Sequence, residues 1–284
     1  MYPFMRDVLQ INPTIEHNSQ ALEQLSLIRD SSPYSSRNSS KGSLVKETLA
    51  VLKAVKKGFP LNSLRQSVLH GRIFQKTSCE TRKSIWRLIR YRYLSVCPEW
   101  ISSSLVSAIE NGIQSEDFLS RVYLYYALRD RLTYDFIAGT VWEKWQAGVT
   151  SIDRNDFLLF LNQISVEQPH IKEWRESTRK KLAGNTLSAM RDFGLLKGTR
   201  IKHIQRPAVS PETVYCLLCI LFAEGKEGRT ILESLDWRLF LWKESDISNA
   251  LVHLAQKKWI RFEKGGHTVI LQLIRPLETY HEQI

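Results

Sequence analysis

The sequence predicts a mainly α-helical fold of helix-turn-helix and winged-helix-like modules, with one small β hairpin, a wing, in its C-terminal half. Three observations carry this prediction. Apolar residues recur at three- and four-residue spacing through most of the chain, as in amphipathic helices. Capping residues and Gly or Pro stops separate these runs. Near the C-terminus, two alternating segments flank the turn Lys264-Gly265-Gly266, which is typical of a hairpin.

Length and composition restrict the class of protein. The chain has 284 residues, of which 43% are hydrophobic, so it can bury cores of its own. Its longest apolar run, Val214 to Ala223, is about half of what a helix needs to cross a bilayer. The first ten residues lack the apolar core of a signal peptide. We therefore expect a soluble, cytoplasmic protein with no membrane partner and with buried thiols instead of disulfides.

The basic charge of the chain is concentrated in two blocks. The formal net charge is +11, from 40 Lys and Arg against 29 Asp and Glu. Residues 41–96 hold 13 basic and two acidic residues, and residues 169–206 carry a net charge of +7, whereas residues 97–168 carry −5. Separate basic blocks are typical of surfaces that neutralise nucleic-acid phosphates. A solvated face that merely aids solubility is the alternative.

Four segments are predicted along the chain. Residues 1–40 form a flexible Ser-rich leader, because the polar stretch Ser31 to Ser40 buries too little apolar area to offset its ordering entropy. Residues 41–98 form a basic helix-turn-helix domain, and residues 99–168 form a helical scaffold section. Residues 169–284 form a winged-helix-like C-terminal domain.

Three helices are expected in the basic domain. The first starts at Ser43 and stops at Gly58-Phe59-Pro60, and the second covers Leu61 to Gly71. The third begins with a capping box, Thr77 to Glu80, and ends near Leu94. This is the order of a helix-turn-helix module, whose last helix enters the major groove of DNA.

The third helix has one apolar face and one basic face. Lys83, Arg87 and Arg90 lie within about 60° of one another, opposite the apolar face, and we expect them to contact phosphates. Arg92 projects from the apolar face, which favours snorkelling or a buried ion pair over DNA contact. The candidate DNA-binding residues of this domain are Arg72, Lys76, Arg82, Lys83, Arg87 and Arg90.

The C-terminal domain combines a basic helix with a helix and hairpin. One long helix is predicted from His170 to Phe193, with a basic stripe on one side. Thr199 to Arg206 alternates and is predicted to form a strand or wing, and Ser210-Pro211 opens the next helix. A helix from Ser245 to Lys258 then precedes the hairpin. The candidate DNA-binding residues of this block are Lys172, Arg175, Arg179 and Lys180.

Catalytic or metal-binding patterns are weak. Cys216 and Cys219 have CxxC spacing, but they lie inside an apolar helix and have no second pair nearby, so core thiols are favoured over zinc or redox chemistry. The pairs Asp130 with Asp135 and Asp153 with Asp156 could supply carboxylates to a metal, and helix caps or surface ion pairs are the simpler interpretation. We expect no enzyme, no metal and no cofactor.

Several short motifs together carry a family resemblance. They are Gly42-Ser43-Leu44 with Glu47, Phe74-Gln75-Lys76-Thr77-Ser78 with Thr81-Arg82 and Ile89-Arg90, Arg131-Leu132 with Tyr134-Asp135-Phe136, and Trp174 with Ser177-Thr178-Arg179-Lys180-Lys181-Leu182 and Gly194-Leu195-Leu196. On these motifs the chain resembles the BrxA family of bacterial BREX phage-exclusion systems, over roughly residues 41–274. Residues 1–40 look like an addition to the family pattern.

The resemblance implies a small, non-enzymatic, mainly helical protein that binds DNA. It also implies other BREX subunits as partners, namely a methyltransferase, a phosphatase-like protein and an AAA-type ATPase. The sequence thus predicts an accessory protein of phage defence that binds duplex DNA mainly through phosphates. Two alternatives stay open. One is a scaffold that docks acidic surfaces of partner subunits, and the other is RNA binding, which a likeness to the antitermination factor NusB implies.

Overall fold

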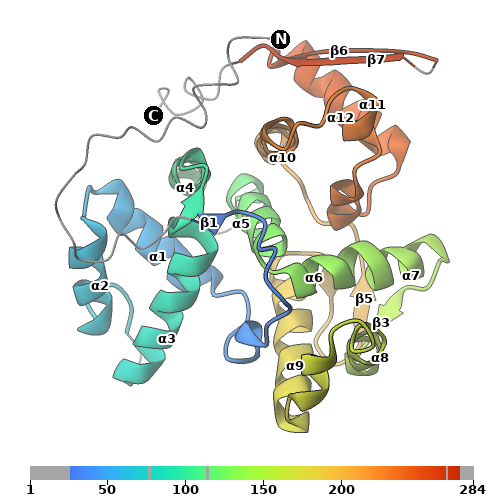
Figure 1. The fold of residues 1–284 in the computed structure, drawn as a ribbon. Helices are drawn as coiled ribbons and strands as arrows, with labels where there is room; N and C mark the ends of the chain where they lie inside the picture. Colours follow the sequence, from blue (N-terminus) through green and yellow to red (C-terminus); the bar gives the residue numbers. More distant parts are fainter. Residues whose placement is uncertain (1–25, 76–77, 113–114, 267, 276–284) are drawn as a thin grey trace.

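The fold was analysed in a computed structural model that describes residues 26–75, 78–112, 115–266 and 268–275 (Figure 1). It is mainly helical, which confirms the predicted fold class. The N-terminal helices lie on one side of the molecule and the C-terminal helices on the other, with α5 between them (Figure 1). The N-terminal helices are α1 (Val45–Lys56), α2 (Leu61–Leu69), α3 (Cys79–Ile89), its π-helical extension η4 (Arg90–Leu94), α4 (Trp100–Ala108) and the 3-10 turn η5 (Ile109–Asn111), and α5 (Glu116–Arg129) follows them.

The remaining helices form a central and a C-terminal group. The central group is α6 (Arg131–Phe136), η6 (Ile137–Val141), α7 (Trp142–Gln146), α8 (Arg154–Ile164), the 3-10 helix η7 (Pro169–Glu173) and α9 (Glu176–Asp192). The C-terminal group is α10 (Pro211–Ala223), α11 (Arg229–Leu232), η8 (Leu235–Phe240) and α12 (Glu244–Gln256).

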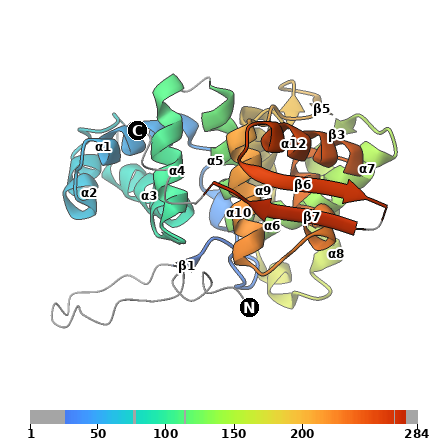
Figure 2. The same cartoon turned by 90° about the horizontal axis from the view of Figure 1, so that it is seen from above.

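Three small sheets complete the fold. A parallel pair joins β1 (Ser26–Leu27) to β2 (Val96–Cys97). An antiparallel sheet has the order β3 (Ser151–Ile152), β5 (Lys202–Ile204) and β4 (Leu196–Lys197). The third sheet is the antiparallel hairpin of β6 (Ile260–Gly265) and β7 (Thr268–Leu273), which lies beside α12 (Figure 2). The predicted helix and hairpin are therefore present, and their assignment as a winged helix stays a prediction.

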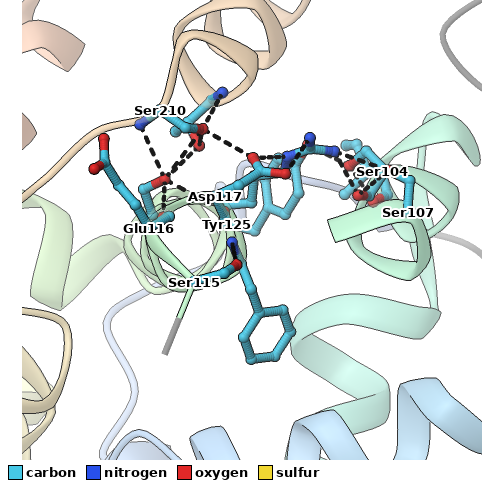
Figure 3. Close-up of polar contacts among 12 residues, drawn as sticks. Ser104, Ser107, Ser115, Glu116, Asp117, Tyr125 and Ser210 are labelled. Carbon is cyan, nitrogen blue, oxygen red and sulfur yellow. Dashed lines mark hydrogen bonds and ion pairs between the residues drawn. The ribbon is translucent and has the colours of Figure 1, made fainter. Parts of the chain in front are cut away.

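Helix α5 is the centre of the core. Every residue from Ser120 to Arg129 is buried, and α4, α6 and α10 pack around the helix. Its Arg121 is 3% exposed and pairs with Asp117, with an Nε to Oδ1 distance of 2.6 Å. The same guanidinium donates to the Ser104 carbonyl oxygen at 2.6 Å. Asp117 also accepts from the hydroxyl of Ser210 at 2.8 Å (Figure 3). One buried polar network thus joins α4, α5 and α10.

The segment from residue 26 to residue 40 packs against the body of the protein. Ile28 is 4% exposed and Asn38 is 2% exposed. Arg29 forms ion pairs with Glu224 at the end of α10 and with Asp236 in η8, the latter at 2.8 Å. The 3-10 helix η3 (Arg37–Ser39) lies against α9, where the Asn185 amide donates to the Asn38 and Ser39 carbonyl oxygens.

The predicted flexible leader is therefore wrong for residues 26–40, and residues 1–25 lie outside the described residues. A Ser-rich composition does indicate little apolar burial. The segment is nevertheless held in place because its few anchoring side chains find buried partners that are distant in sequence. We call residues 26–40 the strap.

The predicted long helix from His170 to Phe193 is wrong, because the chain is extended at Trp174 and Arg175, with ψ angles of 127° and 144°. The 3-10 helix η7 precedes this break and α9 follows it. Ile171 of η7 is fully buried in the core, and α9 begins after the break, at Glu176. A second correction concerns α3, whose cap is Ser78 instead of Thr77. The Ser78 hydroxyl accepts from the Thr81 amide at 3.2 Å.

Asp30 links the strap to η4. Its carboxylate accepts hydrogen bonds from the Ser32 amide at 3.0 Å and from the Tyr91 hydroxyl. Partial burial raises the pKa of Asp30, but the hydrogen bonds from Ser32 and Tyr91 outweigh burial and lower it to about 2. A carboxyl group with a lowered folded pKa stabilises the protein above about pH 4 and loses that contribution as the pH falls towards 2.

We predict that Asp30→Asn lowers the free energy of unfolding by about 1 kcal/mol at neutral pH, since solvent screens part of the interaction. The difference from the unsubstituted protein should shrink as the pH falls from about 4 towards 2, because the native carboxyl group becomes protonated in that range. Urea unfolding at several pH values measures it. A difference that is the same at about pH 7 and about pH 3 would contradict the assigned role.

Candidate nucleic-acid interface

The exposed face of α3 carries two of the predicted cations. Apolar side chains on the opposite face, among them Ile85 and Ile89, are buried together with Leu64 and Val68 of α2. This packing fixes the orientation of α3, so that Lys83 and Arg87 are exposed to solvent. The burial pattern therefore confirms the predicted division of the helix into an apolar and a basic face.

Lys83 is paired, but only at the surface. Its ammonium group lies 2.6 Å from the Glu80 carboxylate one turn away, and both side chains are exposed. The hydrogen bond and charge of Lys83 lower the pKa of Glu80. Arg65 on α2 is exposed and lies close enough to Lys83 to act on it electrostatically. Because exposed pairs of this kind are weak, a phosphate can replace Glu80 as the partner of Lys83.

Among the other predicted residues of this domain, Arg82 and Arg90 have structural partners. Arg82 donates through Nε to the Leu69 carbonyl oxygen at 2.7 Å and so ties α3 to the end of α2. Arg90 is half-buried and donates to the Ser95 hydroxyl at 3.1 Å, and burial lowers its pKa. Arg72 is exposed just beyond α2. Lys76 lies outside the described residues.

Arg92 is a core residue, and its partners are not carboxylates. It is 2% exposed, and its guanidinium donates to the Asn38 side-chain oxygen at 2.6 Å and to the Gly42 carbonyl oxygen at 2.9 Å. The same group lies 4.6 Å from the centre of the Tyr126 ring. The prediction that Arg92 does not face DNA agrees with this burial, whereas the predicted ion pair is replaced by neutral oxygens and an aromatic face.

The break before α9 separates the cations of the second block. Lys172 lies in η7 and Arg175 at the start of α9, and both are exposed. Arg179 donates to the side-chain oxygen of Asn162, and Lys180 pairs with Glu176 at 2.6 Å. The predicted basic stripe along one side of a single long helix is therefore absent.

Helix α1 carries a basic stripe that is not among the residues predicted from the sequence. Lys46, Lys53 and Lys57 are exposed and are separated by seven and four residues, which places them on one side of the helix or its last turn. Arg65 on α2 is also exposed and is likewise not among the predicted DNA-binding residues. The spacing of these lysines is visible in the sequence, and it is the signal that identifies them.

The carboxylates and thiols considered for catalysis have structural roles. Asp153 accepts from the Asn155 amide at 2.7 Å and caps α8, while Asp130 accepts from the Thr133 amide at 3.1 Å and caps α6. Cys216 and Cys219 are buried. Among the described residues no group of three or more potential ligands could hold a metal ion. Within the same ranges, no helix is both long and apolar enough to span a bilayer.

Comparison with known proteins identifies the family. A family model named BrxA matches residues 32–219. The chain belongs to the BrxA family. The match begins inside the strap and ends within α10, so residues 32–40, which we expected to be an addition to the family pattern, belong to the matched range, and the hairpin lies beyond it. Membership of the BrxA family suggests a role in BREX phage defence, as an accessory protein.

One solved structure shares the fold. It is described as the crystal structure of an uncharacterized protein from Magnetospirillum magneticum, and it is 16% identical over 74% of this chain and 100% of that chain, with a TM-score of 0.58. At this identity the likeness concerns the fold alone. A comparison with curated proteins finds no match.

We predict that Arg92→Met destabilises the protein by about 3 kcal/mol, because the buried oxygens of Asn38 and Gly42 lose their donor. Urea unfolding measures this change. Arg87→Met is the matched control, and its exposed side chain predicts an unchanged urea midpoint. Equal stability of the two variants would show that Arg92 does not hold the strap to η4.

Proposed function

We propose that this BrxA-family protein is a non-enzymatic accessory protein of BREX phage defence that binds duplex DNA. The observation that carries the proposal is the solvent face of α3 with the adjoining end of α2. Arg65, Lys83 and Arg87 are exposed there, and Glu80 is the acidic side chain that α3 contributes. A polyanion gains charge-assisted contacts on such a face without displacing any buried group.

Binding is expected to use phosphates more than base edges. Helix α3 carries no Asn or Gln, the side chains that read adenine through two hydrogen bonds. Trp86 and Tyr93 are buried, so these aromatic rings cannot stack on bases. Cations and hydroxyls position a duplex without strongly selecting its sequence. The proposed activity is therefore general DNA binding that places the protein, and any BREX subunit bound to it, on the duplex.

We predict that changing Arg65, Lys83 and Arg87 together to Glu weakens duplex binding at least about tenfold at physiological salt. The melting temperature should stay nearly unchanged, since all three side chains are exposed. Arg90 is left intact because its bond to Ser95 supports the fold. Retardation of a labelled duplex in a native gel measures the loss.

A charge-matched control tests whether position matters as well as charge. Arg229, Lys257 and Arg261 lie in the C-terminal helices and hairpin, away from α3 (Figure 1), and the triple Glu variant there should bind DNA as the unsubstituted protein does. Competition with structured RNA belongs to the same experiment. Undiminished duplex binding by the α2 and α3 variant would overturn the proposed site, and stronger competition by RNA than by duplex DNA would overturn the choice of DNA.

A further inference from the structure

Four cations from three elements lie on the side of the molecule formed by α8, α9 and the sheet β3, β5 and β4. They are Arg154 at the start of α8, Lys181 and Arg191 on α9, and Lys202 on β5. Arg154 and Arg191 are close enough to Lys202 to act on it electrostatically, and Arg154 also lies against Gly184, one turn from Lys181 on α9. None of these was among the candidates from the sequence. We propose that they form a second phosphate-binding surface, which holds a duplex segment different from the one on α2 and α3. This inference rests on the proposed function.

The shape of this surface suits a polymer backbone. Lys181, Gly184, Ser188 and Arg191 follow one another at i, i+3, i+7 and i+10, so they form one stripe along α9, and each is exposed or half-exposed. The Arg154 guanidinium lies over Gly184, where an added Cβ would be 3.6 Å from its nitrogens. Because Gly184 has no side chain, the surface is recessed at the middle of the stripe, and cationic side chains lie on both sides of this recess.

These cations differ from their neighbours in their partners. Among the described residues, no carboxylate pairs with Arg154, Lys181 or Lys202, and the Lys202 ammonium group donates only to the Thr199 carbonyl oxygen at 3.0 Å. Lys180 and Arg206, in contrast, are paired with Glu176 and Asp246. Within the described part of the chain, Arg154, Lys181 and Lys202 thus have no carboxylate partner, whereas Lys180 and Arg206 are each neutralised by one.

The uncompensated charges also repel one another. Burial lowers the pKa of Lys202, and the positive charges of Arg191 and Arg154 lower it further. Arg191 has a partner, its neighbour Asp192, at 3.0 Å, but the other oxygen of Asp192 accepts from the Ser43 hydroxyl at 2.6 Å. Bound phosphates would relieve this repulsion, which is the reason to expect a polyanion here.

The sheet carries further exposed basic residues. Lys197 and His203 are register partners on β4 and β5, and both are exposed. The turn between these strands carries exposed Arg200. Gly198 shapes that turn with a φ of 97°, and a Cβ there would lie 2.2 Å from the Ile201 carbonyl oxygen. Because neighbouring residues of a strand point to opposite faces, Lys197 and His203 lie on the face of the sheet opposite Lys202, and they are not part of the proposed surface.

The two basic surfaces are separate. Helices α3 and α9 lie on opposite sides of the strap segment that contains η3, in both views of the molecule (Figures 1 and 2). The contacts of α9 are with η3, α8 and β4. Two phosphate-binding surfaces on one chain allow it to hold two duplex segments at once, so the predicted property is bridging of DNA.

The test is retention of a fluorescent duplex by a second, immobilised duplex in the presence of the full-length protein. The unsubstituted protein should retain it, whereas Arg154→Gln, Lys181→Gln and Lys202→Gln together should reduce retention at least about tenfold and lower the salt dependence of bridging by about 3 in slope. This variant should still bind a single duplex through α2 and α3. Its melting temperature, compared with that of the unsubstituted protein, shows that it is folded.

Arg229→Gln, Arg261→Gln and Lys264→Gln together form the matched control, because these cations lie in α11 and the hairpin, outside the proposed surface of α8, α9 and β5. The control should bridge normally. Bridging that is absent from the unsubstituted protein, or undiminished in the Arg154, Lys181 and Lys202 variant, overturns the second surface. If single-duplex binding persists in either case, the proposed function stands, and if the unsubstituted protein binds no duplex at all, the proposed function itself fails.

Discussion

From Ser120 to Arg129, helix α5 is buried on every side, so the two arginines of this segment find their partners inside the protein. Arg121 has Asp117, Ser104 and Ser107 as partners, and Arg129 donates to the carbonyl oxygens of Leu27 and Tyr91. Removing one partner from a buried ion pair costs about 3 to 5 kcal/mol, because an uncompensated charge stays in a medium of low polarity. The two arginines therefore determine how α4, α10, β1 and η4 pack around α5, and thereby where the basic helices lie.

The need of buried arginines for partners also explains why the strap is ordered. It contributes few apolar side chains, and yet it supplies the Leu27 carbonyl oxygen to Arg129 and the Asn38 side chain to Arg92. Its own Arg29 connects it to α10 and η8. A polar segment is thus ordered by satisfying buried cations, instead of by burying apolar area of its own. The basic surfaces on α3 and α9 are held on either side of it.

Features set by local chemistry could be predicted from the sequence. Ser210 caps α10, with Pro211 as its first residue, and Gly265 and Gly266 lie at the turn of the hairpin, because capping and turn geometry depend on neighbouring residues. The break at Trp174 could not be predicted, since tertiary packing overrides the helical pattern there. The basic blocks were visible as composition. The partners of Arg92 and Arg82 could not be predicted, because they lie far along the chain or in another helix.

If the exposed cations on α2 and α3 bind the phosphates of a duplex, binding must weaken as the salt concentration rises. Each neutralised phosphate releases condensed counterions, so the logarithm of the association constant falls linearly with the logarithm of the salt concentration. With about five or six phosphates contacted, a titration of the purified protein with duplex DNA should give a slope of roughly −5. An affinity that stays flat between low and physiological salt would contradict the account.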